Sequence, residues 1–396
     1  MNERLLYRLE LQARDIEAVM SEHGVDAQVT GGNVDGGAVT FQVDEAAGID
    51  APTRNTLARV LRTLLGVSEV RLTGLGAQLD VMLDDGDRLD LLPLLESDID
   101  LSPAIVALGW STNDRPLLVN LQDTTWNHIA ILGGPSAGKT ALLRTAAVAL
   151  SISSRQSVAQ MVFVDPDCVR PEVDSGPGLG ALHYLPHALS AILMDLEDVA
   201  NGLAFLVDEC AHRRKHGVRR PVVVVFIDNV DHLLESGGAP VRDALQQLLA
   251  EGHESGVQLV MAARPPQQGA EDHFGSLLSR KSILRLVGRV GDAAAARLAT
   301  GVSDSGAEEL LGRGDSMVVR EENAIRFQSA FVDRYDLHWC LQSLQRRRPP
   351  ALLARSTSAR PAPGASRTGD HEFEFSFDGT RVSVSMSGER LRVGVD

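Results

Sequence analysis

The eight residues Gly133–Thr140, GGPSAGKT, constrain the fold of this chain more than any other feature of the sequence. They match the pattern G-x-x-x-x-G-K-[ST] and stand between an apolar run, His128–Leu132, and a predicted helix, Lys139–Leu150. A glycine-rich turn between a strand and a helix lets backbone N–H groups surround a phosphate, and the helix N-terminus adds positive potential. The segment therefore predicts an α/β fold with a phosphate-binding loop at the end of one strand.

A loop of this kind predicts a nucleotide site, with ATP and Mg²⁺ as the expected ligands. Lys139 is expected to reach the β- and γ-phosphates, and the hydroxyl group of Thr140 is expected to hold Mg²⁺. Such a site also needs an apolar strand that ends in a carboxylate, and Val222–Ile227 followed by Asp228 supplies this second Mg²⁺ ligand. The residues predicted to bind the nucleotide are Gly133, Gly134, Pro135, Ser136, Ala137, Gly138, Lys139, Thr140 and Ala141.

The position after Asp228 bears on whether the nucleotide is hydrolysed. Asn229 stands there, and an amide cannot accept a proton from the attacking water as a general base does. Asp231 is the nearest carboxylate that could act instead; the alternative is a solvated residue at the start of the next helix. Glu235 is a weaker candidate. The sequence therefore predicts nucleotide binding with slow hydrolysis, unless another carboxylate substitutes.

Around the loop, apolar strands alternate with amphipathic helices from residue 104 to residue 332. This order is typical of a parallel sheet covered by helices on both faces. We therefore expect a RecA-like P-loop NTPase domain over residues 101–345. Further expected strands are Gln160–Val164 and Val257–Ala262, and further expected helices are Ala188–Cys210 and Pro240–Ser255.

The residues before this domain, 1–100, predict a small α+β subdomain. Apolar residues recur at helical spacing over residues 1–23 and again over 54–65. Strand-like segments are expected at residues 25–29, 38–43, 69–72 and 78–82, with the glycine-rich stretch 31–37 as a turn.

Beyond the ATPase domain, residues 346–370 are rich in Pro, Ser, Ala and Arg without a period, which predicts a flexible linker. Residues 371–396 then alternate apolar and polar side chains between two turns, Asp378–Gly379 and Ser387–Gly388, and predict a three-stranded β tail. A meander of this size is too small to be stable alone. We therefore expect the tail to dock on another surface, with a protein partner not identified by the sequence.

The formal charge of −15 does not decide whether the partner is nucleic acid. Residues 1–120 hold 9 basic and 20 acidic side chains, a net charge of −11, so the remaining residues carry only −4. A local basic surface is therefore compatible with the composition.

The sequence also indicates the compartment. No apolar run approaches the roughly 18–20 residues that span a bilayer, and the charged first residues lack the apolar core of a signal peptide. The three cysteines, Cys168, Cys210 and Cys340, are far apart and form no metal-ligand pattern. We interpret them as small buried thiols in a reducing compartment, and expect a cytoplasmic protein.

Taken in chain order, eight segments resemble the FtsK/SpoIIIE family of hexameric DNA translocases, over about residues 10–345. The most specific is GAEELLGRGDSM at residues 306–317. The others include ALGWSTNDRPLLVNLQDTTWNHIAILGG before and into the loop, then VFVDPD, YLPH, SGVQLVMAARP and RFQSAFVD. The resemblance implies a ring, most simply a hexamer, that binds ATP and moves along double-stranded DNA.

In this family, arginines of a neighbouring subunit reach the γ-phosphate. Arg285 and Arg297, in RLVGRVGDAAAAR, match the positions of two such arginines. The alternative is that both are surface arginines on a sheet edge and a helix.

Motors of this kind hold DNA phosphates with loops that carry Arg and Lys, without reading the base sequence. The basic run HRRKHGVRRP is the first candidate; its alternative is a solvated helix end, where basic side chains favour the helix dipole. Arg264 and the Pro265–Gln268 stretch match a second region, and Arg346–Arg348 could add nonspecific contacts. The predicted DNA-binding residues are Arg213, Arg214, Lys215, Arg219, Arg220 and Arg264.

Several positions depart from the family. Asn229 replaces its catalytic Glu, Ala263 replaces a Gln, and Asp167 stands where a Lys usually follows Asp-Pro. The family's winged-helix domain and membrane anchor are not recognisable in the sequence. Two alternatives therefore stay open beside a translocase with weakened hydrolysis. One is a hydrolysis-deficient, nucleotide-gated DNA-binding ring or scaffold, and the other is an ATPase module like those of type VII secretion motors.

Overall fold

In the computed structural model the chain forms two compact units, Met1–Arg88 with Leu353–Asp396, and Leu89–Leu352. The linker predicted over residues 346–370 lies, from residue 347 on, outside the described residues. So do Gln267, Gln268 and the tips of the two tail hairpins. The described residues are 3–395 except 36–37, 46–48, 75–77, 85–87, 98, 100, 114, 124, 169–177, 267–274, 276–282, 321–322, 347–370, 378–379 and 388–389.

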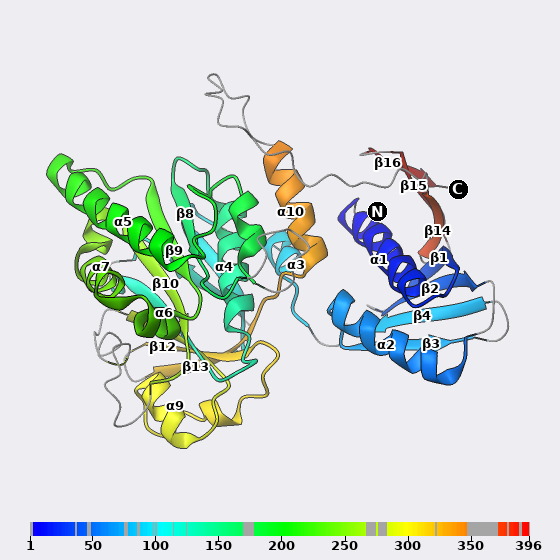
Figure 1. Cartoon of the computed structure of the whole chain (residues 1–396), viewed down its shortest axis with the longest axis horizontal. Coiled ribbons are helices and arrows are strands. Elements are labelled where there is room, and N and C mark those ends of the chain that lie inside the picture. Colours follow the sequence, from blue (N-terminus) through cyan, green and yellow to red (C-terminus); the bar gives the residue numbers. More distant parts are fainter. Residues whose placement is uncertain are drawn as a thin grey trace. The chain divides into compact units, whose positions relative to one another are not determined.

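The first unit is built on a sheet that joins both ends of the chain. Within the described residues it has seven strands in the order β16-β15-β14-β1-β2-β4-β3 (Figure 1). Its chain begins with helix α1, Glu3–Glu22, and helix α2, Ala51–Leu65, follows the first hairpin. The strands are β1 Ala27–Asp35, β2 Ala38–Glu45, β3 Glu69–Thr73, β4 Gln78–Asp84, β14 His371–Phe377, β15 Thr380–Ser387 and β16 Arg390–Val395.

Local sequence signals explain the two helices of this unit. Apolar side chains of α1 that recur every three or four residues, such as Leu9, Ile16 and Met20, are buried, as the periodicity predicts. The side chain of Asp50 accepts a hydrogen bond from the backbone N–H of Thr53 and so caps α2. The expectation of a turn over residues 31–37 was wrong in part, because β1 continues through this stretch to Asp35 and pairs with β2.

The C-terminal tail extends this sheet. Strand β14 runs parallel to β1, with Gly32 opposite Phe375, and β15 and β16 follow as antiparallel neighbours. The predicted tail thus has a docking surface in its own chain, since backbone pairing with β1 supplies the hydrogen bonds that an isolated meander lacks.

The second unit is built on a nine-stranded sheet, counted over the described residues, in the order β6-β5-β13-β12-β11-β7-β10-β9-β8. Strands β11, β7, β10, β9 and β8 are parallel, and the strands from β12 to β6 are antiparallel. The parallel part is the α/β fold that the loop predicts. The strands are β5 Ile105–Ser111, β6 Arg115–Asn120, β7 His128–Leu132, β8 Ala159–Val164, β9 Val222–Ile227, β10 Val257–Ala263, β11 Ile283–Gly288, β12 Asp315–Arg320 and β13 Asn323–Ser329.

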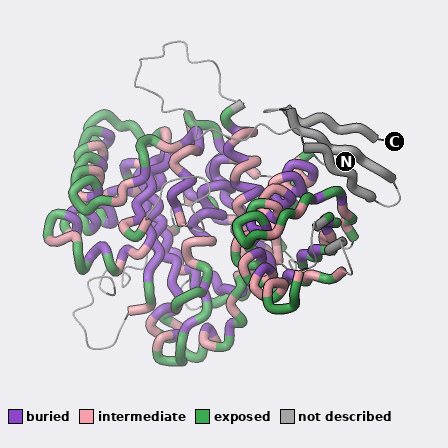
Figure 2. Tube along the Cα trace, turned by 45° about the vertical axis from the view of Figure 1, so that its right-hand side comes forward, coloured by how far each residue is buried: buried purple, intermediate pink, exposed green. Residues whose placement is uncertain are grey.

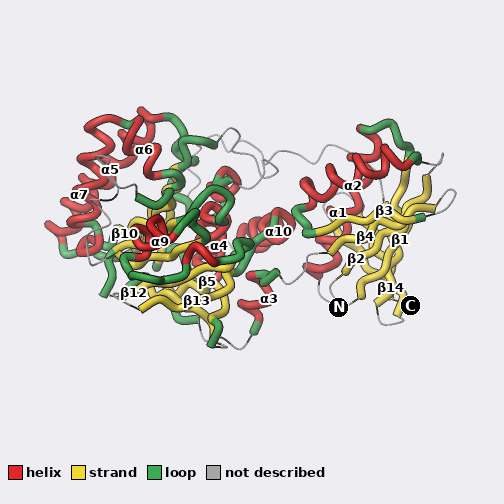
Figure 3. The backbone as a smooth tube through the Cα atoms, turned by 90° about the horizontal axis from the view of Figure 1, so that it is seen from below, coloured by secondary structure: helices red, strands yellow, loops and turns green. Residues whose placement is uncertain are grey.

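Helices cover both faces of this sheet (Figures 1 and 3), and the central strands between them are buried (Figure 2). In β7, Ile129 and Ile131 belong to the core on one face, while Ala130 and Leu132 belong to the core on the other. Burial of a Leu or Ile side chain stabilises the folded state by roughly 1.5–3 kcal/mol relative to leaving it exposed. The cores on both faces therefore hold the strand in place. The first face carries α3 Leu91–Glu96, α4 Lys139–Ser153 and α10 Arg334–Arg346, and the second carries α5 Leu196–His216, α6 Val230–Ser236, α7 Gly238–Glu251 and α9 Ala293–Thr300.

One predicted helix begins at the wrong residue. The sequence predicts a helix over Ala188–Cys210, but α5 starts at Leu196, where Asp195 accepts a hydrogen bond from the N–H of Glu197. Before it, Ala188 and Leu193 form parallel bridges with β8. The backbone groups at the open edge of β8 need hydrogen-bond partners, and residues 188–193 supply them through these bridges. These residues are therefore not helical despite their helical propensity.

Candidate functional site

The glycine-rich loop lies between the end of β7 and the start of α4. The backbone N–H of Gly134 donates to the carbonyl of Arg289 at 2.8 Å, and that of Gly133 donates to Ala263 at 3.3 Å. A Cβ atom on Gly133 would lie 2.7 Å from the Cβ of Ala137, which is too close. Gly138 has a φ of 86°, a conformation that favours glycine. The loop therefore needs its glycines at these positions.

Lys139 lies folded into the loop. Its Nζ donates hydrogen bonds of 3.0 Å to the carbonyl oxygens of both Gly133 and Gly134. Burial lowers the pKa of this amine, while the nearby carboxylates of Asp228 and Asp231 act in the opposite direction. A half-buried ammonium group at this point offers a positive charge to a phosphate that enters the loop.

Thr140 and Asp228 form the second half of the site. The Thr140 hydroxyl group donates to Asp228 Oδ2 at 2.6 Å, and the backbone N–H of Asn229 donates to Oδ1 at 3.0 Å. Asp228 is only 3% exposed, and burial, together with the negative charge of Asp165, raises its pKa to about 6. Two hard oxygen donors in contact suit Mg²⁺, so these residues fit the metal that the loop motif implies.

The strand order explains why these groups meet. Strand β10 lies between β7 and β9, and all three are parallel, so the loop after β7 and Asp228 after β9 project from the same edge of the sheet. Asp165 follows β8 at this edge, is 4% exposed and accepts hydrogen bonds from the N–H groups of Asp167 and Leu179. Burial raises the pKa of Asp165.

Two further carboxylates complete this edge. Asp231 Oδ2 pairs with the Nε atom of Arg264 at 2.6 Å, so the predicted base and a predicted DNA contact bind each other. The Nδ2 atom of Asn229 donates to Asp167 Oδ2 at 2.8 Å, across 62 residues of sequence. The sequence marks Asp167 only as a departure from the family pattern, and its position after Asp-Pro at the end of a predicted strand is the one signal that it belongs to the site.

The two arginines expected to act on a neighbouring subunit differ in their surroundings. Arg285 is half-buried on β11, its Nη1 atom donates to the carbonyl of Ala299 at 3.2 Å, and burial lowers its pKa. Arg297 is exposed on α9. A guanidinium that reaches another subunit must be accessible, so the geometry favours Arg297 for that predicted role.

The basic run at the end of α5 separates into buried and exposed residues. Arg213 is only 5% exposed and donates to Glu209 Oε1 and to the carbonyl of Pro221, both at 2.7 Å. Arg214 forms an ion pair with Glu251 at 2.6 Å, whereas Lys215 is exposed. In this conformation Arg213 is not available to DNA, because its guanidinium connects α5 to the segment before β9.

We expect Arg213→Met to lower the free energy of unfolding by about 2–4 kcal/mol, because it removes a buried guanidinium and leaves its partly buried acceptors without a donor. Chemical denaturation at constant pH measures this change. Lys215→Met, which removes the same charge from an exposed position two residues away, should change stability by less than about 0.5 kcal/mol. Equal effects of the two substitutions would contradict a structural role for Arg213.

Arg219 and Arg220 line a cavity of about 240 Å³ at the other edge of the sheet, where β9 and β10 begin. His253 and Gln258 also line it. Gln258 is 1% exposed, and neither polar atom of its amide has a hydrogen-bond partner among the described residues. The cavity thus combines positive charge with an unpaired amide, which is suitable for an anionic group.

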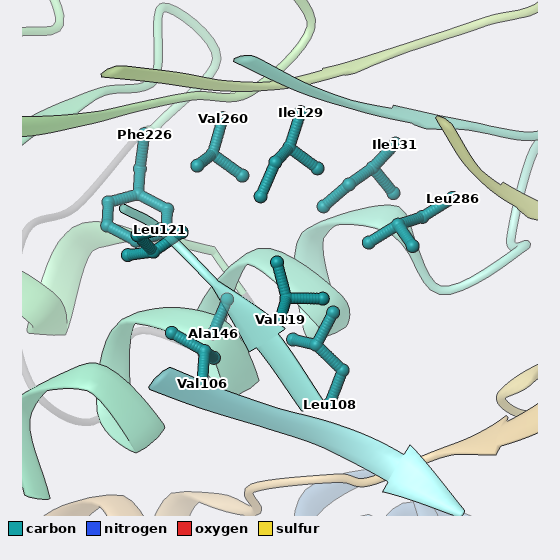
Figure 4. Close-up of a pocket in the computed structure, with 10 residues that line it drawn as sticks. All are labelled: Val106, Leu108, Val119, Leu121, Ile129, Ile131, Ala146, Phe226, Val260 and Leu286. Atoms are coloured by element: carbon teal, nitrogen blue, oxygen red, sulfur yellow. The ribbon is translucent and has the colours of Figure 1, made fainter. Parts of the chain in front are cut away.

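A second void carries no comparable chemistry. It has a volume of about 10 Å³ and lies in the core of the second unit, among the ten labelled side chains from Val106 to Leu286 (Figure 4). All ten are apolar, so the void offers a polar ligand nothing to bind.

Comparisons with known proteins show which proteins this chain resembles in sequence. Residues 96–220 match the model of the FtsK/SpoIIIE family. Over 446 residues the chain is 21% identical to the DNA translocase FtsK of Pseudomonas syringae pv. tomato, covering 96% of this chain and 54% of the relative. The FtsK of Mycobacterium tuberculosis H37Rv is 23% identical over 431 residues, with coverages of 96% and 50%. The chain therefore spans about half the length of these curated relatives.

Solved structures of P-loop ATPases share the fold. The pCW3 conjugation coupling protein TcpA has a TM-score of 0.50 at 16% identity, covering 85% of this chain and 99% of that one. ATPases 2 and 3 of EssC from Geobacillus thermodenitrificans have a TM-score of 0.52 at 14% identity, with coverages of 78% and 61%. In the part of the chain that the structure describes, no helix is both long and apolar enough to cross a membrane. The chain is therefore a homologue of the FtsK DNA translocases and carries an FtsK/SpoIIIE-family domain on a P-loop ATPase fold.

Proposed function

We propose that this chain is an ATP-dependent motor of the FtsK/SpoIIIE type that forms a ring, most simply a hexamer, around double-stranded DNA. The single observation that supports it best is the contact of Thr140 with Asp228 at the edge of the sheet where Lys139 lies in the loop. A loop, an ammonium group and a pair of oxygen ligands at one sheet edge are the parts that phosphoryl transfer needs.

Each group has a defined task in this proposal. The backbone of Gly133–Thr140 and the Lys139 ammonium group hold the phosphates of ATP, which requires Lys139 to leave the two carbonyl oxygens it now contacts. Thr140 and Asp228 are the Mg²⁺ ligands, and the metal supplies charge stabilisation to the phosphates. Arg297, or Arg285 after rearrangement, acts on the nucleotide of the neighbouring subunit in the ring.

The DNA-binding part of the proposal rests on the exposed basic residues. Arg219 and Arg220 flank a cavity with the unpaired amide of Gln258, and a backbone phosphate could occupy it. Lys215 is exposed near them in sequence, and Arg214 and Arg264 would have to exchange their present acidic partners for phosphates.

We expect the double variant Arg219→Ala/Arg220→Ala to bind duplex DNA about tenfold more weakly. It should also reduce the slope of log affinity against log salt by about 2, because two phosphate contacts are lost. Fluorescence anisotropy with a labelled duplex at several salt concentrations measures both quantities. Arg59→Ala/Arg62→Ala, which removes the same charge from the exposed face of α2, is the control. An unchanged slope in the first variant would place the DNA elsewhere.

A nucleotide-gated ring or scaffold is the second candidate, and Asn229 favours it because an amide cannot act as a general base. In that case the chain binds ATP with turnover near zero, and a protein partner binds the β tail. Strand β16 lies at the end of the sheet, so its open edge can pair with a strand of that partner. Steady-state ATP hydrolysis with and without long duplex DNA separates the two: stimulation by DNA supports the motor, and tight ATP binding without turnover supports the scaffold. The cytoplasmic location stays a prediction.

A further inference from the structure

We propose that Asp167 is the catalytic base of this ATPase, and that Asn229 is the residue that positions it. The inference rests on the proposed function, because it assigns the acceptor for the proton of the attacking water. It assigns that role to a residue after β8, rather than to the residue after Asp228 or to Asp231.

Four carboxylates lie at this edge of the sheet: Asp165, Asp167, Asp228 and Asp231. Two of them, Asp165 and Asp228, are buried and already accept hydrogen bonds. Asp228 accepts hydrogen bonds from the Thr140 hydroxyl group and from the N–H of Asn229, which suits a metal ligand. Asp165 is 4% exposed and accepts hydrogen bonds from backbone N–H groups of the segment that follows β8, so it stabilises the conformation of that segment. Neither carboxylate is accessible to a water molecule that approaches from solvent.

Asp231 is close to the loop but has an unsuitable partner. Its Oδ2 atom forms a 2.6 Å ion pair with Arg264, and its Oδ1 atom is buried. One oxygen atom is thus occupied by the Arg264 guanidinium and the other is shielded from solvent, so a water molecule has poor access to either. The ion pair therefore favours a structural or sensing role for Asp231.

Asp167 differs from the other three in exposure and in the group that holds it. It is exposed, and its Oδ2 atom accepts a 2.8 Å hydrogen bond from the neutral amide of Asn229. The same Asn229 donates its backbone N–H to Asp228 Oδ1. One residue thus binds the metal-ligand carboxylate through its backbone and the Asp167 carboxylate through its side chain.

The backbone of Asn229 makes this double contact possible. Its φ of 48° and ψ of 46° place it in the left-handed region, which Asn tolerates better than most residues. The amide of Asn229 contacts only Oδ2 and so orients the Asp167 carboxylate, and the exposure of Asp167 gives water access to it. An asparagine at this position is therefore compatible with hydrolysis, since the carboxylate is supplied by the neighbouring strand.

The oxygen of a water molecule forms a bond to the γ-phosphorus, while the bond from that phosphorus to the β–γ bridging oxygen breaks and its electron pair stays with ADP. The proton of the water moves to a carboxylate oxygen of Asp167 and is later released to solvent. Inorganic phosphate and ADP are the products.

Asp167→Asn should lower kcat for ATP by about 100-fold or more and leave the Kd for ATP, measured with a fluorescent ATP analogue, within about threefold. Asp231→Asn is the matched control and should lower kcat far less. The exchange variant Asp167→Asn/Asn229→Asp keeps one carboxylate and one amide in contact but moves the carboxylate next to Asp228. The kcat of this exchange variant should be at least about tenfold higher than that of Asp167→Asn.

The outcomes separate the two levels of the proposal. Full kcat in Asp167→Asn, with loss of kcat in Asp231→Asn, would assign the base to Asp231 and overturn the inference while the motor function stands. A wild-type protein that binds ATP with no turnover, even with DNA present, would overturn both. Weakened ATP binding in Asp167→Asn without a change in kcat would show a structural role and also overturn the inference.

Discussion

Replacing Lys139 by alanine is expected to reduce ATP turnover by at least about 100-fold and to weaken the binding of ATP. The reason is geometric: Lys139 Nζ contacts the carbonyl oxygens of Gly133 and Gly134, so its charge lies inside the loop that surrounds the phosphates. Replacement leaves the backbone N–H groups of the loop in place but removes its cation. Turnover measured with a coupled assay and binding measured by calorimetry report the two effects separately.

The control for this experiment is Lys215→Ala, which removes the same charge from an exposed position at the end of α5. It should leave turnover and ATP affinity unchanged in the absence of DNA. Turnover by Lys139→Ala at the level of the wild-type protein would mean that the measured activity is not that of this loop.

Asp228→Asn is expected to have opposite effects on stability and on activity. The pKa of Asp228 is raised from 3.8 to about 6, so the folded protein binds a proton more tightly there than the unfolded chain does. The stabilising effect of that proton is complete below about pH 4 and is lost as the pH rises through about 6. At pH 7.5 the ionised carboxylate therefore costs about 3 kcal/mol, which an asparagine avoids.

We thus expect metal-free Asp228→Asn to be more stable than the wild-type protein at pH 7.5, by up to about 3 kcal/mol, and equally stable near pH 4. The same variant should lose Mg²⁺-dependent ATP hydrolysis, because the carboxylate ligand is gone. Denaturant unfolding in EDTA at both pH values measures the first effect. Asp243→Asn, an exposed position on α7, is the control. Destabilisation of Asp228→Asn at pH 7.5 would show that burial is not the main influence on this carboxylate.

The sequence alone determined the parts of the site that depend on short segments. The strand, loop and helix at residues 128–150 and the strand ending at Asp228 can be recognised because each is encoded by neighbouring residues with a defined spacing. Strands β7 and β9 have the bounds that their apolar runs predict. These two strands are buried along their whole length, and such strands are marked by continuous apolar runs.

Only the tertiary structure decided which groups far apart in sequence meet. Within one basic run, it buries Arg213 under the start of β9 and leaves Lys215 exposed. It also brings Asp167 to Asn229, and it pairs the tail strand β14 with β1. The sequence cannot show these contacts, because strand order and the orientation of a helix depend on long-range pairing and packing. The spacing of residues within a short segment does not determine that pairing. The sequence thus determined the glycine-rich loop and the residues predicted to hold its metal, and the tertiary structure decided which carboxylate lies beside them.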